Sequence, residues 1–219
     1  MHHHLKRCAV AAVGAVVLSA LVGCGGTNAG GGDSLSVDRL ITLAEEDGKG
    51  GSDRCPLPYD AGKAADAAKV EEAIEPGAAG AEAGEPVATA EGGKTTDPQS
   101  AWAGKGGALV TCSYHVGKED LKVLTVGAEA GNSVNIMLPT IQMAGGMSMD
   151  EVKRYAEAAT QAETGEAVPS QGGNVVLVRL DSGGKGDVAM TLTTGESGKT
   201  SLKPEQVLEL ARTFAAQAK

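Results

Sequence analysis

Residues 108–116 read Ala-Leu-Val-Thr-Cys-Ser-Tyr-His-Val, and small or apolar side chains fall on every second position. Successive side chains of a β-strand point to opposite faces, so this alternation predicts a strand with one buried face. That face is predicted to hold Ala108, Val110, Cys112, Tyr114 and Val116. One strand cannot be stable alone, so its partners are sought in the neighbouring sequence.

Four further segments have the composition of strands. Residues 121–127 and 133–138 follow residues 108–116 after short turns, which predicts an antiparallel meander. Residues 174–181 and 187–193 flank a glycine-rich turn and predict a hairpin. Together these segments predict an antiparallel sheet of about five strands.

Helical patterns surround the predicted strands. Residues 36–47 and 61–74 carry apolar side chains at helical spacing. Ser148-Met149-Asp150-Glu151 is a capping box, and Pro204 suits the first position of a final helix. The predicted order is α-α-βββ-α-ββ-α, an α+β fold with helices packed on one face of the sheet.

Residues 76–107 consist largely of Glu, Ala, Gly and Pro. Such a segment buries too little apolar surface to offset its ordering entropy, so we interpret it as a disordered insertion. It interrupts a single domain that spans residues 36–219. Trp102 is the one aromatic residue of the insertion. We expect Trp102 to cap the core, and the alternative is an anchor for a binding partner.

The N-terminus has the pattern of a bacterial lipoprotein signal. Lys6 and Arg7 precede an apolar run of about fifteen residues, shorter than a membrane span of roughly 20, which ends at Leu21-Val22-Gly23-Cys24. We expect a signal peptide over residues 1–23 and acylation (palmitate) of Cys24; the alternatives are an uncleaved anchor and an ordinary secreted protein. Lipid on Cys24 and a glycine-rich tether over residues 24–35 would hold the domain at the extracytoplasmic face of the cytoplasmic membrane.

Cleavage would leave an acidic chain with two unassigned cysteines. Loss of Lys6 and Arg7 takes the basic residues from 19 to 17 against 28 acidic residues, a net charge of −11. This charge disfavours nucleic acid as a partner. Cys55 and Cys112 are predicted to form a disulfide, because two thiols outside the cytoplasm usually pair. Two buried free thiols are the alternative.

Three short motifs carry a resemblance. The lipobox that ends at Cys24, the pair Cys55-Pro56 and the later Cys112-Ser113-Tyr114 resemble those of uncharacterised actinobacterial cell-envelope lipoproteins with paired cysteines. The resemblance implies an envelope lipoprotein, and it implies no activity.

No set of residues has the spacing of a known catalytic or metal site. His115 is the one histidine after the predicted signal peptide, and it points away from Cys112 if both lie in one strand. Residues 195–200 imitate a phosphate-binding loop, but Thr193 replaces the first glycine of that motif. A carboxylate pair drawn from distant positions stays open, although sugar-binding clefts need more aromatic rings. We expect no catalytic residues, no metal and no cofactor.

Methionines gather between residues 137 and 149, at positions 137, 143, 147 and 149. Thioethers bind Cu(I), but they also fill irregular cores, and we favour the core. The alternative is an adaptable apolar groove formed by Met137, Ile141, Met143 and Trp102. This groove is our predicted position for a ligand or partner.

These observations favour a membrane-anchored, non-enzymatic lipoprotein that binds or scaffolds an envelope protein, with an unknown oligomeric state. The alternative is a small-molecule or lipid-binding lipoprotein with an apolar pocket near residues 136–149. A pocket lined by Val, Leu and Met favours the small-molecule alternative. A closed core with an exposed Trp102 favours a protein partner.

Overall fold

The computed structural model describes residues 35–47, 50–93, 102, 106–129 and 131–218. The predicted signal peptide, Cys24 and most of the predicted tether lie outside the described residues. Residues Gly32–Lys219 form one compact unit that contains every described helix and strand. Among the described segments, no helix combines the length and hydropathy that crossing a membrane requires.

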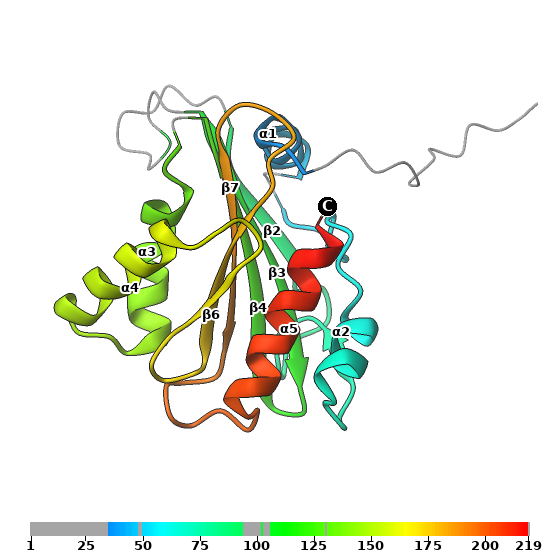
Figure 1. The fold of residues 1–219 in the computed structure, drawn as a ribbon. Coiled ribbons are helices and arrows are strands. Elements are labelled where there is room, and N and C mark those ends of the chain that lie inside the picture. The colour runs from blue at the N-terminus through cyan, green and yellow to red at the C-terminus, as the bar shows by residue number, and fades with distance from the viewer. Residues whose placement is uncertain (1–34, 48–49, 94–101, 103–105, 130, 219) are drawn as a thin grey trace, which may run out of the picture. The chain divides into compact units, whose positions relative to one another are not determined.

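The described strands form one open antiparallel sheet, as predicted (Figure 1). Its order is β1-β3-β4-β7-β6-β5, and β2 also pairs with β3. The strands are β1 (Ile74–Pro76), β2 (Ala88–Gly93), β3 (Gly107–Val116), β4 (Glu119–Ala128), β5 (Ala167–Pro169), β6 (Val175–Leu180) and β7 (Asp187–Thr194). The helices are α1 (Val37–Asp47), α2 (Ala61–Ala68), α3 (Ser133–Gly145), α4 (Met149–Gln161) and α5 (Pro204–Gln217).

Strand β3 has the predicted alternation. Its even-numbered side chains from Ala108 to Val116 are buried, and the odd-numbered ones from Leu109 to His115 are half-buried. The β3–β4 hairpin turns at Gly117, whose φ of 57° lies in the left-handed region that glycine adopts without strain. The central hairpin of the sheet therefore follows directly from the local sequence.

Helices cover both faces of the sheet, so the prediction that they pack on one face is wrong (Figure 1). Helices α3 and α4 pack on the face that presents Leu124, Val126 and Leu177. Helices α1 and α5 pack on the opposite face, and α2 packs against α5. Strands β4, β6 and β7 thus have buried residues on both faces, which one covered face would not require.

Residues 133–138 were predicted to be a strand but form the first half of α3. Val134, Met137 and Ile141 are buried at helical spacing, and the helix continues through Pro139. The helix starts here because the Asp187 carboxylate, on β7, accepts hydrogen bonds from the Ser133 N–H at 3.2 and 3.3 Å.

The predicted disordered insertion contains one strand, β2, and the strand β1 ends at its first residue, Pro76. Residues 88–93 form β2 and pair with β3 from Ala88 opposite Cys112 to Gly93 opposite Gly107. Strand β1 pairs with the other end of β3, where Ile74 lies opposite Val116. Backbone pairing to the edge of β3 orders residues 88–93, although few of their side chains are large and apolar. Ile74, predicted to end the second helix, is a strand residue, because α2 stops at Ala68.

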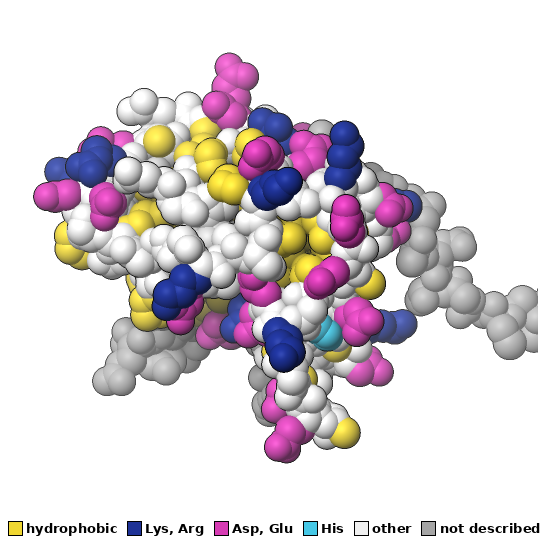
Figure 2. Space-filling view, turned by 90° about the horizontal axis from the view of Figure 1, so that it is seen from below, with side chains coloured by type: hydrophobic (Ala, Val, Ile, Leu, Met, Phe, Trp, Pro, Cys, Tyr) yellow, Lys and Arg dark blue, Asp and Glu magenta, His cyan; other side chains and the backbone are white. Residues whose placement is uncertain are grey.

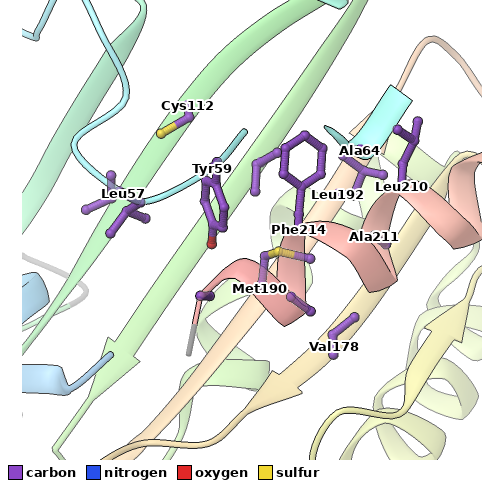
Figure 3. Packing of buried hydrophobic residues seen from close by; sticks show 14 of the residues in the cluster. Leu57, Tyr59, Ala64, Cys112, Val178, Met190, Leu192, Leu210, Ala211 and Phe214 are labelled. Atoms are coloured by element: carbon purple, nitrogen blue, oxygen red, sulfur yellow. The ribbon is translucent and has the colours of Figure 1, made fainter. Parts of the chain in front are cut away.

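The larger core lies between the sheet and α1, α2 and α5 (Figure 3). Phe214 of α5 lies at its centre, with ring centroids 5.4 Å from Tyr59 and 5.9 Å from Tyr114. The Tyr59 hydroxyl and the Thr125 hydroxyl share a buried hydrogen bond of 2.6 Å. The smaller core under α3 and α4 includes Trp102. Trp102 is therefore a core residue, as the favoured interpretation predicted.

Candidate functional site

Cys55 and Cys112 form a disulfide, with their Cα atoms 5.4 Å apart. The bridge joins the loop before α2 to the middle of β3, and both sulfurs face the larger core. The bridge ties the segment that precedes β1 to the strand that follows β2. Its position is structural, because Cys112 is fully buried.

His115 lies on the opposite face of β3 from Cys112, as its position in the strand predicted. The His115 Nδ1 lies 3.0 Å from the Gly77 carbonyl oxygen, and its Nε2 lies 3.5 Å from a carboxylate oxygen of Glu75. The His115 side chain is 21% exposed, so it is largely enclosed by its neighbours. These contacts hold the short strand β1 against β3.

The four predicted groove residues do not line one surface. Met137, Ile141 and Trp102 are buried together in the smaller core. Met143 is 78% exposed. The apolar stripe of α3 explains this difference, since Met137 and Ile141 face the sheet whereas Met143 falls on the outer side of the helix.

Met143 instead lines an open pocket of about 990 Å³, which we call the hairpin pocket. Lys122 and Leu124 of β4 and Thr193 of β7 come from the sheet. Val116 and Lys118 come from the β3–β4 hairpin, and Thr140, Met143 and Ala144 come from the last turns of α3. The pocket exists because α3 ends at Gly145, before it covers the hairpin end of the sheet. Figure 2 looks onto this end of the molecule and shows apolar side chains exposed among charged ones.

The loop between β7 and α5 closes one side of the hairpin pocket and is fastened to Glu119. The Glu119 carboxylate accepts hydrogen bonds from the hydroxyls of Thr194 and Thr200 and, at 2.6 Å, from the Ser201 N–H. Partial burial raises the pKa of Glu119, but these hydrogen bonds outweigh it and hold the pKa below its usual value. Residues 195–200 thus form a strand-to-helix loop, and α5 begins only at Pro204.

Some charged side chains on the rim of the hairpin pocket have partners within the chain, and others do not. Glu196 pairs with Lys199, and Asp120 accepts a 2.7 Å hydrogen bond from the Ala79 N–H. The side chains of Lys118 and Lys122 make no hydrogen bond or ion pair with any residue that the structure describes. The pocket therefore combines an apolar wall with three charged groups that are available to a ligand, the ammonium groups of Lys118 and Lys122 and the carboxylate of Glu72.

A second, smaller pocket of about 400 Å³ lies between α4, the end of α3 and the β5–β6 turn. We call it the α4 pocket, and it is lined by Gly146, Glu151, Arg154, Gln171, Gly172 and Ser197. Tyr155 also lines it, but the Tyr155 hydroxyl already donates a 2.7 Å hydrogen bond to the Val168 carbonyl. Burial raises the pKa of Tyr155, which keeps this phenol neutral.

Local sequence patterns pointed to Met143, and the only polar pocket residues that they singled out lie in residues 195–200, the imitation of a phosphate-binding loop. Lys118, Lys122 and Glu119 flank a turn, where charged residues are ordinary. The capping box at Ser148 was the one signal for Glu151, and it indicated a helix start rather than a pocket.

Among the described residues, no three His, Cys, Asp or Glu side chains come together as a metal site would require. No protein-family model, no curated protein and no solved structure matches the chain significantly. The geometry of the two pockets is therefore the basis for a functional assignment.

Proposed function

We propose that the chain is a membrane-anchored extracytoplasmic lipoprotein that binds a small amphipathic molecule in the hairpin pocket. The anchor is inferred from the sequence, where Lys6, Arg7 and the apolar run lead to the lipobox at Cys24. Lipid on Cys24 would keep the binding domain next to the membrane, where amphipathic molecules are concentrated.

The observation that carries the binding function is the lining of the hairpin pocket. Met143, which is 78% exposed, and the nearly buried Leu124 provide the apolar surface of this open pocket of about 990 Å³. That volume is at the upper end of the range for small-molecule sites. Trp102 is buried, so it does not provide the exposed aromatic anchor expected for a protein-binding role.

The ligand chemistry follows from the rim. Lys118 and Lys122 would attract an anionic group, while Leu124 and Met143 would contact a hydrocarbon chain. A fatty acid or a lipid with an anionic headgroup has both properties. The flexible thioether of Met143 suits chains of different shapes.

Titration calorimetry with dodecanoate tests this function on residues 25–219. This form lacks Cys24 and its lipid, so no detergent is needed. Met143→Glu would place a carboxylate against the hydrocarbon chain, and we expect dodecanoate to bind at least about tenfold more weakly. Met149→Glu is the matched control, because Met149 is 70% exposed but does not line the pocket. Equal weakening in both variants, or no binding to the unmodified chain, would refute the proposal.

A protein partner is the second candidate function. Met143 and Met149 are the two large hydrophobic residues that are exposed in the described part of the chain, and they flank the turn between α3 and α4. An envelope protein that contacts this turn would cover both side chains. In that case both glutamate variants would weaken the complex, whereas dodecanoate binding requires Met143 alone.

A further inference from the structure

The methionines in the described part of the chain differ widely in their access to solvent. Met143 is 78% exposed and Met149 is 70% exposed, whereas Met137 is 2% exposed and Met190 is fully buried. Met147 is half-buried. A small oxidant reaches the sulfur of an exposed methionine, but a close-packed core excludes it. Exposure therefore separates Met143 and Met149 from the other three.

Hydrogen bonding distinguishes the two exposed thioethers from each other. The Gln142 Nε2 donates a 3.2 Å hydrogen bond to the Met149 sulfur. This bond engages a lone pair of the sulfur, and a sulfur lone pair is what attacks an oxidant. The Met143 sulfur accepts no hydrogen bond from any residue that the structure describes. Met143 is thus both the more exposed and the more nucleophilic of the two.

The cysteines offer no competing site for an oxidant. Cys55 and Cys112 are already oxidised to a disulfide, and Cys112 is fully buried. Residues 25–219 contain no other cysteine. Met143 is therefore the sulfur group in the described part of the chain that is best placed to react with a peroxide.

From these differences we propose that Met143 is a site of reversible oxidation by hydrogen peroxide, and that its oxidation turns off ligand binding in the hairpin pocket. The Met143 sulfur attacks one peroxide oxygen and the O–O bond breaks. The leaving hydroxide takes the proton of the transferred oxygen and becomes water. The thioether is oxidised by two electrons to a sulfoxide, and the peroxide is reduced to water. Sulfoxide reductases restore the thioether.

The effect on binding rests on the proposed function. Met143 and Leu124 provide the apolar surface of the hairpin pocket, and Leu124 is only 6% exposed. A sulfoxide is polar, so oxidation replaces the most accessible apolar surface of the pocket with a group that is unfavourable against a hydrocarbon chain. Met149 does not line the pocket, so its oxidation leaves this surface unchanged.

The first experiment tests the oxidation site and needs no ligand. Residues 25–219 contain the whole compact unit Gly32–Lys219 and are treated with hydrogen peroxide for increasing times. Peptide mass spectrometry follows the addition of one oxygen atom to each methionine. We expect Met143 to react faster than Met149 and at least about tenfold faster than Met137. If Met149 reacts first, or if Met137 reacts as fast as Met143, the assignment of the site is overturned.

The second experiment tests the effect on binding by titration calorimetry with dodecanoate. Oxidation should weaken binding at least about tenfold in the unmodified chain and equally in Met149→Leu. Met143→Leu has no thioether at this position, so its own affinity should be the same before and after peroxide treatment. Oxidation of other residues would weaken binding in Met143→Leu as well, and that result would overturn the switch. Unchanged affinity in the oxidised unmodified chain would also overturn it.

Failure of the proposed function has a different signature. If dodecanoate does not bind the untreated chain, the hairpin pocket is not its site, and the claim that oxidation turns off binding there is overturned with it. The relative oxidation rates of Met143, Met149 and Met137 still decide whether Met143 is the oxidation site, because that measurement involves no ligand.

Discussion

The Ser133 hydroxyl donates a 2.6 Å hydrogen bond to the Asp187 carboxylate, which joins the first residue of α3 to the first residue of β7. The Ser133 N–H binds the same carboxylate. Asn132, at the helix N-cap, makes no side-chain capping bond, so Asp187 replaces the local cap. A residue 54 positions away thus determines where α3 begins.

Asp187→Ala should therefore destabilise the chain through α3. We expect the free energy of unfolding to fall by about 1–2 kcal/mol, the usual range for the loss of a helix cap. Urea denaturation followed by circular dichroism measures the change. Asp181→Ala is the control, because Asp181 is an exposed acid of the same hairpin without a bond to α3. Equal losses in the two variants would show that Asp187 does not cap the helix.

Glu119 should make the stability depend on pH. Its pKa is lowered in the folded chain, so the ionised carboxylate stabilises the fold above the ordinary pKa of 4.5 and loses that effect as the pH falls through its folded value. Glu119→Gln should lower the free energy of unfolding at pH 7 by about 1 kcal/mol, a modest value because the group is partly exposed.

The difference between Glu119→Gln and the unmodified chain should shrink as the pH falls from 4.5 towards the lowered pKa of folded Glu119, since both side chains are neutral below that pKa. Urea denaturation at several pH values tests this trend. Glu157→Gln, at an exposed position of α4, should show no such trend. A difference that is independent of pH would contradict the role of the Glu119 hydrogen bonds.

The disulfide should contribute the largest single stabilisation. Its cysteines are 57 positions apart, and closure of a loop of that size is worth about 4 kcal/mol on the chain-entropy model. We expect the Cys55→Ala, Cys112→Ala double variant to lose about 2–5 kcal/mol. Dithiothreitol should lower the melting temperature of the unmodified chain and leave that of the double variant unchanged. If dithiothreitol left the melting temperature of the unmodified chain unchanged, the bridge would not hold the fold.

Lys69 ends α2 in the left-handed conformation, with φ 54° and ψ 43°. A side chain is disfavoured there, whereas glycine is the usual residue at this position. Lys69→Gly should raise the free energy of unfolding by about 0.5–1 kcal/mol. Thermal melts measure the change. Lys69→Ala, which keeps a Cβ atom, should have little effect on the melting temperature. A gain in both variants would attribute the effect to the lost charge instead.

The central strands were predictable because their pattern is local. Strand β3 alternates from Ala108 to Val116, β4 includes the predicted residues 121–127, and α4 and α5 begin at the predicted cap and proline. The start of α3 depends on Asp187, and β2 depends on pairing with β3, so neither can be recognised from its own residues. The helical stripe through Met137 and Ile141 is visible in the sequence, but the alternating residues before it favoured a strand.

The candidate site was predictable only in part, because most of its residues come together from elements that are separate in the sequence. Met143 lies in the methionine-rich stretch that was predicted to bind a ligand, but its pocket partners come from β4, β7 and the two flanking turns. The separation of Met143 from Met137 follows from the helix, because residues six apart lie on different sides of a helix. Lys118, Lys122 and Leu124 join Met143 only through the packing of α3 on the sheet.

Native mass spectrometry most directly tests the claim that the hairpin pocket holds an amphipathic ligand. Residues 25–219 should be produced in an envelope-matched host and kept non-reduced. The account predicts an excess mass of roughly a few hundred daltons that disappears on denaturation and is absent from Met143→Glu. A bare chain, two hydrogens lighter than the reduced mass because of the Cys55–Cys112 disulfide, would contradict the claim and favour a protein partner.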